Sequence, residues 1–496
     1  MTQQRIDGQA HSTDRTFAQY IDGEFVPGAG ALLTVENPYT ERAIAEVACS
    51  SVADVDRAVA AARAATDEGP WPRLSKRERS RILARMADCL DKKRTELEEL
   101  HVAETGMFRK MNDSFGVGLP IRWWHDYAEL ASRDLDHAVP PDITDTGTGL
   151  RLAGGMVYQE PVGVVSAISP FNFPFFVSTH KVAAALAAGC AVVLKLSELT
   201  PLTCFLIAEA AAEAGLPPGV FNYVIGDAEV GRRMVEHPGV DCVSFTGSTV
   251  VGKQIAATAA QTVKKVVLEL GGKSAAIVLP DADLDSCVPT LLGQFSHGGQ
   301  GCALSTRLVL HDDIADEVIQ RLVALVPFLK AGDPADPTTT HSPQITSAAR
   351  ERVLGFIRSG LDAGAELVTG GGPITTQPHG HWVEPTLLDR CPTDASVAQE
   401  EIFGPVLVVH RFRTDDEAVA IANNSRYGLW GTVFTRDLPR AMALARRIRT
   451  GSVGINGMAL NIHAPFGGVK ESGIGREFGE YGIREFLEPK SVSWVL

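Results

Sequence analysis

The chain has 496 residues, of which 45% are hydrophobic and 21% are charged, and its formal net charge is −14. This length exceeds what one simple core supports, so we expect a globular protein of two or three subdomains. The negative charge argues against nucleic acid or an anionic membrane surface as a partner, because both require a basic surface. It is compatible with a bound dinucleotide, whose few phosphates can be held by local backbone amides.

The chain shows no feature of export or membrane insertion. Residues 1–15 lack the apolar stretch of a secretory signal, and the longest apolar run, 182–194, is too short to span a bilayer. The eight cysteines are scattered and have no CxxC spacing. We therefore expect reduced thiols in a cytoplasmic protein, with neither a disulfide framework nor a metal site.

Short β-branched runs alternate with helical patterns along the chain, which is typical of α/β architecture. A capping box at Ser75 and Glu78 predicts the start of one helix. A first group of strands is expected at 162–168, 191–196, 221–225, 242–245 and 264–268. A second group is expected at 406–412, 431–434 and 452–455, with a helix at 415–423. These groups predict two doubly wound open-sheet domains divided near 268–272, and residues 134–160, which fit neither group, predict a protruding hairpin.

The most informative local pattern is the glycine-rich sequence GGQGC, which ends at Cys302. A cysteine nucleophile needs access to its substrate and surroundings that favour its thiolate. The small neighbours leave room for a substrate, although a buried structural cysteine beside a turn has the same pattern. In a second stretch, LELGGK, Glu269 lies between leucines, where desolvation raises the pKa of a carboxyl toward that of a general base. An ion pair between Glu269 and Lys273 is the alternative there.

Two further stretches indicate phosphate and ribose contacts. The sequence FTGSTVVG at 245–252 places a strand, a glycine turn and a helix start in succession, so its amides and the Ser248 hydroxyl are candidates to hold a pyrophosphate. It is neither the G-x-G-x-x-G fingerprint nor a P-loop, and a plain helix cap has the same appearance. Lys195 and Glu198 follow a buried strand, where an open α/β sheet presents its ligand contacts, or they are solvated loop charges.

Together these stretches resemble the aldehyde dehydrogenase superfamily, in matching order from about residue 20 to residue 492. The matching pieces are EPVGVVSAISPFNFP (160–174), KLSELTP (195–201), FTGSTVVG (245–252), LELGGK (268–273), GQGC (299–302), EEIFGPV (400–406), NNSRYGL (423–429) and PFGGVKESGIGRE (465–477). The resemblance implies oxidation of an aldehyde to a carboxylic acid with NAD, NADP being the less favoured cofactor because Glu198 repels a 2′-phosphate. In this reaction a thioester forms on the cysteine and is then hydrolysed.

The resemblance also implies roles for individual residues. Cys302 matches the nucleophile, Glu269 the general base and Asn172 the amide that stabilises the oxyanion. Lys181 and Glu477 match a pair proposed to help proton movement. The residues implied to contact the cofactor are Ile168, Ser169, Pro170, Phe171, Lys195, Ser197, Glu198, Gly226, Phe245, Thr246, Gly247, Ser248, Val251, Leu270, Gly271, Glu401 and Phe403.

The chain departs from the usual family pattern at four positions. Phe171 replaces a tryptophan, Leu196 a proline, and His180 an aromatic or aliphatic residue, while Gly301 precedes the nucleophile. No catalytic group is lost, so these departures bear on substrate identity. An aromatic-lined entrance is expected to favour uncharged aliphatic or aromatic aldehydes, unless its members are core residues; they are Phe173, Phe175, Phe295 and Phe466.

The resemblance implies a NAD-binding domain (1–133 and 161–268), a catalytic domain (269–466) and an oligomerisation element (134–160 and 467–496) of a homodimer or homotetramer. Two other functions remain open. A CoA-acylating relative transfers the acyl group to CoA, although Glu269 would then be dispensable. The second open possibility is a protein of the same fold that either has no catalytic activity or is a thiol hydrolase using Cys302 and His297.

Overall fold

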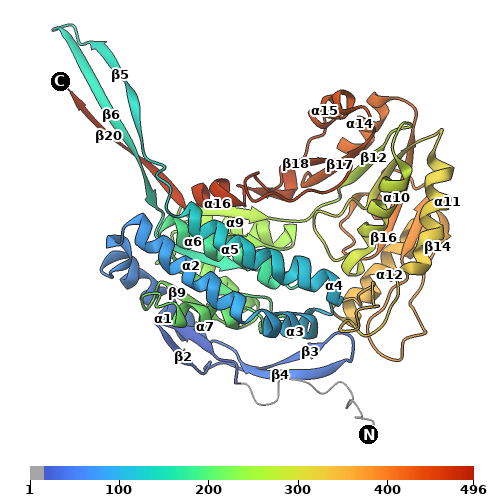
Figure 1. The fold of residues 1–496 in the computed structure, drawn as a ribbon, viewed down its shortest axis with the longest axis horizontal. Helices are drawn as coiled ribbons and strands as arrows, with labels where there is room; N and C mark the ends of the chain where they lie inside the picture. The colour runs from blue at the N-terminus through green and yellow to red at the C-terminus, as the bar shows by residue number, and fades with distance from the viewer. Residues whose placement is uncertain (1–15, 496) are drawn as a thin grey trace.

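The computed structural model describes residues 16–495, so the expectation of no leader over 1–15 lies outside the described residues. Figure 1 shows two bodies, each built around a sheet, and a long arm that projects from one of them. Within residues 16–495, none of the helices combines the length and the apolarity needed to cross a bilayer.

The first body is built on an eight-stranded sheet of order β19-β11-β10-β7-β8-β9-β1-β2. Its parallel centre consists of β7 (Val164–Ile168), β8 (Ala191–Lys195), β9 (Phe221–Val224), β10 (Cys242–Thr246) and β11 (Lys265–Glu269). Three short strands attach by antiparallel pairing: β1 (Gln19–Ile21), β2 (Glu24–Val26) and β19 (Gly473–Ile474). All five strands expected in this half are confirmed, with ends that differ by at most two residues.

Helices cover both faces of this sheet, as a doubly wound fold requires. They are α1 (Val52–Asp67), α2 (Lys76–Lys92), α3 (Arg94–Thr105), α5 (Leu119–Leu130), α6 (Pro174–Ala188), α7 (Phe205–Glu213), α8 (Ala228–Glu236) and α9 (Thr249–Ala260). The capping box at Ser75 and Glu78 is confirmed at the start of α2. One core joins α2, α5, α6 and α7 to one face, and a second joins α1, α8 and α9 to the other.

The second body is built on a seven-stranded sheet of order β14-β15-β16-β13-β12-β17-β18. The strands are β12 (Ala275–Val278), β13 (Arg307–His311), β14 (Glu366–Thr369), β15 (Thr386–Asp389), β16 (Val406–Phe412), β17 (Trp430–Phe434) and β18 (Ser452–Ile455). All are parallel except the edge strand β14. The helices are α10 (Leu284–Leu292), α11 (Ala315–Leu325), α12 (Ser347–Asp362), α13 (Ser396–Gln399), α14 (Asp415–Asn423) and α15 (Leu438–Ala445). The expected helix at 415–423 and strands at 406–412 and 452–455 are confirmed with their bounds, and the strand expected at 431–434 begins one residue earlier.

The arm confirms the predicted protruding hairpin. It consists of β5 (His137–Asp145), β6 (Leu150–Pro161) and β20 (Leu487–Val495), paired antiparallel with β6 in the middle. Every residue of β5 is exposed. The arm therefore stands away from both bodies (Figure 1). The remaining elements are the hairpin β3 (Leu32–Asn37) and β4 (Arg42–Ala48), the short helix α4 (Arg109–Met111), a π-helix at 112–118 and α16 (Gly479–Glu485).

Candidate active site

Cys302 lies in a loop between α10 and β13 that the backbone holds in a tight path. His297, Gly298 and Gly299 have φ angles of 51°, 61° and 72°, in the left-handed region where glycine is favoured. A Cβ on Gly299 would lie 2.1 Å from the carbonyl oxygen of Gly404. The glycines of the GGQGC stretch are therefore needed for a close backbone approach, and Cys302 stays half-buried at the end of that path.

The Cys302 thiol faces negative charge. Burial raises its pKa well above the ordinary value, and the carboxyl groups of Glu269 and Glu401 raise it further, while the backbone N–H of Cys302 lowers it. These surroundings therefore favour the protonated thiol, contrary to the expectation that they would favour the thiolate. A nucleophilic role for Cys302 requires a base close enough to take the thiol proton.

Glu269 ends β11 and supplies a buried carboxylate without hydrogen-bonded partners. It is 2% exposed, and neither of its oxygens meets a donor in good geometry among the described residues. Burial raises its pKa well above the ordinary value; the nearby Glu477 carboxylate raises it too, and the Lys181 and Arg476 cations lower it. The alternative of an ion pair with Lys273 is not seen, because the Lys273 ammonium has no hydrogen-bonded partner among the described residues.

Asn172 connects α6 to the cysteine loop. It is 4% exposed, and its side-chain Nδ2 donates a hydrogen bond of 2.8 Å to the carbonyl oxygen of Gln300, two residues before Cys302. The second N–H on Nδ2 is left for another acceptor. Gln300 braces the same loop, since its Nε2 donates to the carbonyl oxygens of His297 and Pro343.

Lys181 and Glu477 form a buried ion pair next to Glu269. Lys181 Nζ lies 2.8 Å from Glu477 Oε1 and 3.1 Å from the Ser244 hydroxyl, and the Lys181 side chain is wholly buried. The pair brings α6 into contact with the segment before α16. Both charges act on the pKa of Glu269, so the two side chains belong to the same site.

The expected cofactor residues gather where the strand order of the first sheet reverses. The chain passes from β7 to β8 and β9 on one side, and β10 and β11 lie on the other. Ligands of open α/β sheets bind at the carboxyl ends of strands at such a switch point. Residues 168–171 leave β7 there, and 245–248 leave β10 and lead to α9, whose N-cap is Ser248.

Several details of this region suit a dinucleotide. The Thr246 hydroxyl is buried without a hydrogen-bonded partner among the described residues. Gly226 is buried against Val230, and a Cβ there would lie 2.4 Å from the Val230 side chain, so the close approach requires glycine. Lys195 is buried at the end of β8, and its Nζ lies 3.8 Å from the half-exposed Glu198 carboxylate. Ser197 accepts from the backbone N–H of Leu199 in the same loop.

Glu401 and Phe403 reach this region from the second body. Glu401 Oε1 accepts a hydrogen bond of 3.0 Å from the backbone N–H of Gly272, and a Cβ on Gly271 would lie 2.7 Å from Oε2. Burial raises the pKa of Glu401 to about 7. Phe403 has a φ of 57°, unusual for a bulky residue, and its ring contacts that of Phe171 edge-on at 5.8 Å.

The remaining cofactor residues lie at the start of α9 and after β11. Val251 is exposed in the first turn of α9, and its backbone N–H donates to the Ser248 hydroxyl. Leu270 is buried and packs against Gly252. A Cβ on Gly252 would lie 2.3 Å from the Leu270 side chain. The structure therefore brings the expected cofactor residues to one side of the first sheet and to the facing part of the second body.

His297 has neither the contacts nor the charge of a base for Cys302. Its Nε2 lies 3.1 Å from the carbonyl oxygen of Asn172, and its Nδ1 is buried without a partner among the described residues. Burial lowers its pKa to about 3, so the imidazole is a very weak base. The structure gives no support to a Cys302–His297 pair.

Two of the four aromatic residues expected at the entrance are core residues. Phe175 and Phe295 are fully buried in the hydrophobic cores of the two bodies, and that part of the prediction is wrong because the backbone directs both side chains inward. Phe173 and Phe466 are half-buried. They belong to a set of touching rings that comprises Phe115, Trp123, Phe173, Phe176, His180, Phe466 and Phe478.

Sequence reasoning missed two residues, Gly467 and Arg352, that shape the surroundings of Glu269 and Phe403. A Cβ on Gly467 would lie 2.5 Å from Glu269 Oε1, and Gly467 has a φ of 149°. Arg352 donates to the carbonyl oxygens of Glu401 and Ile402 and so fixes the backbone beside Phe403. The PFGG sequence indicates that Gly467 is special, but it does not show the contact between Gly467 and Glu269, because these residues lie far apart in the chain.

The structure combines two mostly parallel α/β sheets, an exposed antiparallel arm, and a Cys302 thiol whose pKa is affected by the buried Glu269 carboxyl. These are features of an α/β enzyme. The model of the aldehyde dehydrogenase family matches residues 25–492. The chain belongs to the aldehyde dehydrogenase family.

Individual relatives agree along nearly the whole chain. Geranial dehydrogenase of Castellaniella defragrans is 42% identical and covers 95% of this chain and 98% of its own. Mitochondrial succinate-semialdehyde dehydrogenase of Arabidopsis thaliana is 40% identical, covering 93% of this chain and 85% of its own. The NAD+ complex structure of an aldehyde dehydrogenase from Bacillus cereus superposes with a TM-score of 0.92 at 36% identity, covering 97% of each chain.

Proposed function

We propose that this protein oxidises an aldehyde to a carboxylic acid with NAD, through a thioester on Cys302 that Glu269 helps water to hydrolyse. The observation that carries the proposal is the buried Glu269 carboxylate, which makes no hydrogen bond of good geometry within residues 16–495 and raises the pKa of the Cys302 thiol. A carboxylate in an apolar setting is a strong base for its type.

The first half of the reaction forms a carbon–sulfur bond. Glu269 takes the thiol proton, and the Cys302 sulfur attacks the aldehyde carbon. The oxyanion that results needs donors placed in advance, which the free N–H on Asn172 Nδ2 and the backbone N–H of Cys302 supply. One such donor contributes about 3–4 kcal/mol to lowering the barrier. Because Gln300 holds Asn172, the donor is already oriented before the substrate arrives.

The second half of the reaction releases the acid. NAD, when bound, accepts the hydride that leaves the former aldehyde carbon, and the acyl group remains on the Cys302 sulfur. Glu269 first releases the thiol proton to solvent and then removes a proton from water. The water oxygen attacks the thioester, and the sulfur leaves as a thiolate. Lys181 and Glu477 set the proton affinity of Glu269 through their opposite charges and are proposed as its route for proton exchange.

The residues at the strand ends fit NAD. The amides at the start of α9, together with Ser248, are suited to a pyrophosphate, because a helix N-terminus carries free N–H groups and partial positive charge. Lys195 and Glu198 are suited to a ribose diol, and the Glu198 carboxylate disfavours the 2′-phosphate of NADP. Glu401 and Phe403 are proposed to contact the nicotinamide half.

We propose that the two bodies and the arm have different roles. We assign NAD binding to 1–133 and 161–268, catalysis to 269–466, and oligomerisation to 134–160 and 467–496. Strand β19, at Gly473–Ile474, pairs with β11, so the last segment also contributes to the first sheet. That pairing brings Glu477 back toward Glu269.

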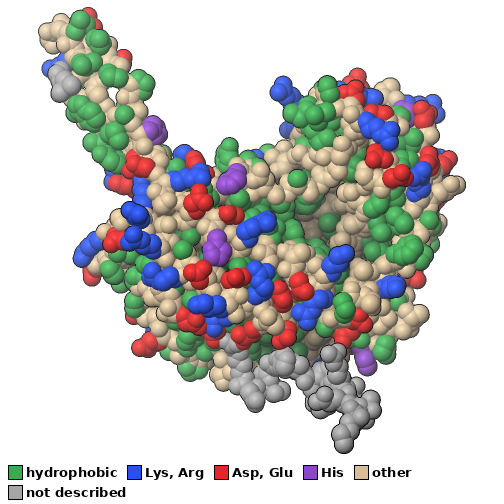
Figure 2. Space-filling model, viewed as in Figure 1, with side chains coloured by type: hydrophobic (Ala, Val, Ile, Leu, Met, Phe, Trp, Pro, Cys, Tyr) green, Lys and Arg blue, Asp and Glu red, His purple; other side chains and the backbone are tan. Residues whose placement is uncertain are grey.

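The substrate is proposed to be an uncharged aldehyde with an aromatic or aliphatic body. The half-buried Phe173 follows Asn172, and the half-buried Phe466 precedes Gly467, which lies against Glu269, so two of the touching rings lie next to the proposed site. Figure 2 shows a hollow with hydrophobic side chains between the two bodies. Measuring NADH formation across a panel of aldehydes tests this; faster turnover of short charged semialdehydes than of apolar aldehydes would reject it.

The arm is proposed to join copies of this chain into a homodimer or homotetramer. Its exposed apolar side chains include Ile143, Leu150, Trp494 and Val495, which monomers rarely leave in one patch.

A cytoplasmic location is also proposed, and the eight free cysteines are consistent with a reducing compartment.

Replacing Cys302 by alanine tests the proposed nucleophile. The variant is expected to produce no NADH from any aldehyde while binding NAD as the wild type does, because the cofactor contacts lie on other residues. Acid formation by the wild type without added CoA separates hydrolysis from acyl transfer to CoA. Turnover in the alanine variant would reject the mechanism.

A further inference from the structure

A buried carboxylate of α3 holds the loop that follows β8. Glu104 is fully buried, and its oxygens accept hydrogen bonds from the backbone N–H of Leu202 at 2.7 Å, the backbone N–H of Thr203 at 3.0 Å, and the Thr203 hydroxyl. The donors lie about a hundred residues further along the chain. An apolar side chain of the same size would fill the space but leave three buried donors without an acceptor.

The loop held in this way carries the residues proposed to bind the adenosine ribose. It starts at Lys195, passes through Ser197 and Glu198, and ends at the beginning of α7. The Thr200 hydroxyl donates to the carbonyl oxygen of Phe171 at 3.2 Å, and the Tyr223 hydroxyl donates to that of Pro201. The loop is therefore pinned on both sides of Pro201, while the Glu198 side chain projects toward solvent.

The three donors favour the ionised form of Glu104, and among residues 16–495 no charged group assists them. The titratable side chains that act on or are affected by this carboxyl are the Cys204 thiol and the Tyr223 phenol, and burial raises the pKa of both, which keeps them neutral. His101, on the same helix, is also neutral because burial lowers its pKa to about 4.

Without a neighbouring cation, burial raises the pKa of Glu104 to about 7, although the three hydrogen bonds lower it. Near neutral pH the carboxyl therefore exchanges its proton. The protonated form loses acceptor capacity and adds an O–H among groups that already donate.

We propose that Glu104 is a positioning residue for cofactor binding: its carboxylate holds the 195–203 loop in the shape that receives the adenosine ribose. This inference rests on the proposed function, because it takes Lys195 and Glu198 as ribose contacts. Glu104 itself touches neither cofactor nor substrate.

The test measures binding of ADP-ribose to the apoenzyme by titration calorimetry at about pH 6 and about pH 8. The groups of ADP-ribose do not titrate between these values. It keeps the ribose next to the missing nicotinamide, which Glu401 is proposed to approach, so the wild type and both variants are compared in a Glu401→Gln background, because the pKa of Glu401 is itself about 7. For Glu104→Gln, the dissociation constant at the higher pH is expected to rise about tenfold, as loss of a charge-assisted hydrogen bond implies. The KM for aldehyde at saturating NAD is expected to stay unchanged.

The pH dependence separates positioning from a general packing role. Wild-type affinity is expected to fall as Glu104 takes up its proton on going to the lower pH, whereas Glu104→Gln, which cannot titrate, is expected to bind equally at both. Thr203→Val removes one donor to the ionised carboxylate, raises the pKa of Glu104 further, and is expected to move the loss of affinity to higher pH. This second variant keeps the test valid if Glu104→Gln does not fold.

Two results would contradict the inference, and they differ in meaning. Wild-type protein that binds no ADP-ribose would reject the proposed cofactor site itself. Wild-type binding that Glu104→Gln reproduces at both pH values, or a Thr203→Val profile identical to the wild type, would reject the positioning role alone.

Discussion

At the scale of single residues, the proposed base Glu269 depends on two features of its surroundings: few hydrogen-bond donors and no side chain at position 467. In the described part of the chain Glu269 makes no hydrogen bond of good geometry, and Gly467 allows the backbone to pass close to Oε1. A side chain at position 467 would meet that oxygen at 2.5 Å. Catalysis is expected to be more sensitive to this contact than folding is.

Gly467→Ala is therefore expected to lower kcat at least tenfold by displacing the Glu269 carboxylate, because small misplacements of catalytic groups are costly. Gly457→Ala is the matched control: Gly457 has nearly the same φ, 148°, but its added Cβ would meet nothing closer than Thr290 at 4.0 Å. Steady-state kinetics and thermal midpoints measure both. Equal losses of kcat in the two variants would show that backbone strain, not the contact, is responsible.

The charges around Glu269 predict opposite pH shifts. A base must be deprotonated, so kcat is expected to rise with pH through the raised pKa of Glu269. Glu477→Gln removes a charge that raises this pKa and should move the midpoint of the kcat profile to lower pH. Lys181→Met removes a charge that lowers it and should move the midpoint to higher pH. Shifts in the same direction would contradict the assignment.

The sequence marks the proposed catalytic residues more clearly than it marks their surroundings. Cys302 and Glu269 lie in short local patterns, GGQGC and LELGGK, that suggest their chemistry without a fold. The Gly467 contact, the Glu104 anchor and the inward direction of Phe175 and Phe295 depend on which segments meet in space, and no local pattern records that.

At the scale of elements, one arginine joins the second sheet to its helices. Arg307 on β13 is 3% exposed and donates to the carbonyl oxygens of Ile421 and Ala422 at 2.9 and 2.8 Å, at the end of α14. Arg307 also donates to the carbonyl oxygen of Lys273, which directly follows Gly271 and Gly272 in the chain. A cation at a helix C-terminus is favourable, and here it also fixes the catalytic segment.

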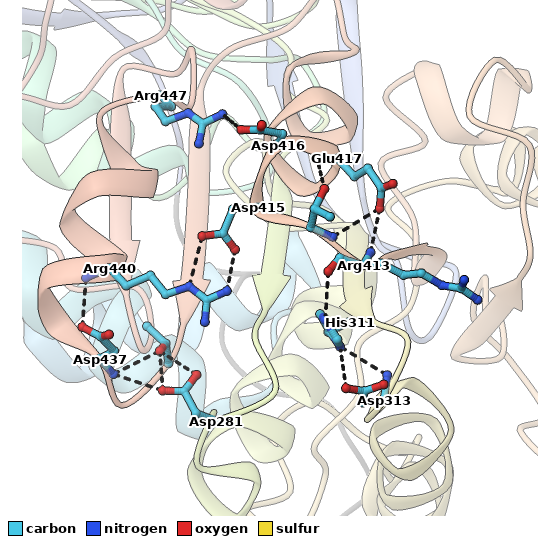
Figure 3. A network of polar contacts seen from close by, with 12 residues as sticks. Asp281, His311, Asp313, Arg413, Asp415, Asp416, Glu417, Asp437, Arg440 and Arg447 are labelled. Atoms are coloured by element: carbon cyan, nitrogen blue, oxygen red, sulfur yellow. Dashed lines mark hydrogen bonds and ion pairs between the residues drawn. The ribbon is translucent and has the colours of Figure 1, made fainter.

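Arg307→Met is expected to destabilise the protein by at least about 3 kcal/mol, because several buried carbonyl groups lose a charged donor. Arg447→Gln is the control: it breaks the exposed ion pair with Asp416 on α14, drawn in Figure 3, and should cost at most about 1 kcal/mol. Urea unfolding midpoints measure both. A loss in Arg307→Met no larger than in the control would contradict this role.

The long buried strands were predictable, whereas the short edge strands were not. Strands β8 (AVVLK) and β16 (VLVVHRF) each begin with four consecutive apolar residues, which is the pattern of a parallel sheet covered on both faces. Strands β1, β2 and β19 contain only two or three residues each, and their pairing depends on the neighbouring sheet. The π-helix at 112–118, which carries Phe115, likewise has no distinct sequence pattern.

At the scale of the whole molecule, the arm is the feature that a monomer does not explain. Ile143 is 64% exposed and Leu150 is 74% exposed, on neighbouring strands that stand away from both bodies. The double variant Ile143→Asp/Leu150→Asp is expected to shift the protein to monomers in size-exclusion chromatography with light scattering. Val263→Asp, at a site 90% exposed outside the arm, should leave the assembly unchanged. An unchanged mass for the arm variant would contradict the proposed oligomerisation role.

The measurement that tests the central claim most directly is the intact mass of Glu269→Gln after mixing with an aldehyde and NAD. Formation of the thioester on Cys302 and its hydrolysis both use this carboxylate, but hydrolysis depends on it most, because water is a weaker nucleophile than sulfur. We predict a burst of about one NADH per active site followed by very slow turnover, with the acyl mass on the peptide that contains Cys302. Sustained wild-type turnover without an adduct, or an adduct on another cysteine, would contradict the account.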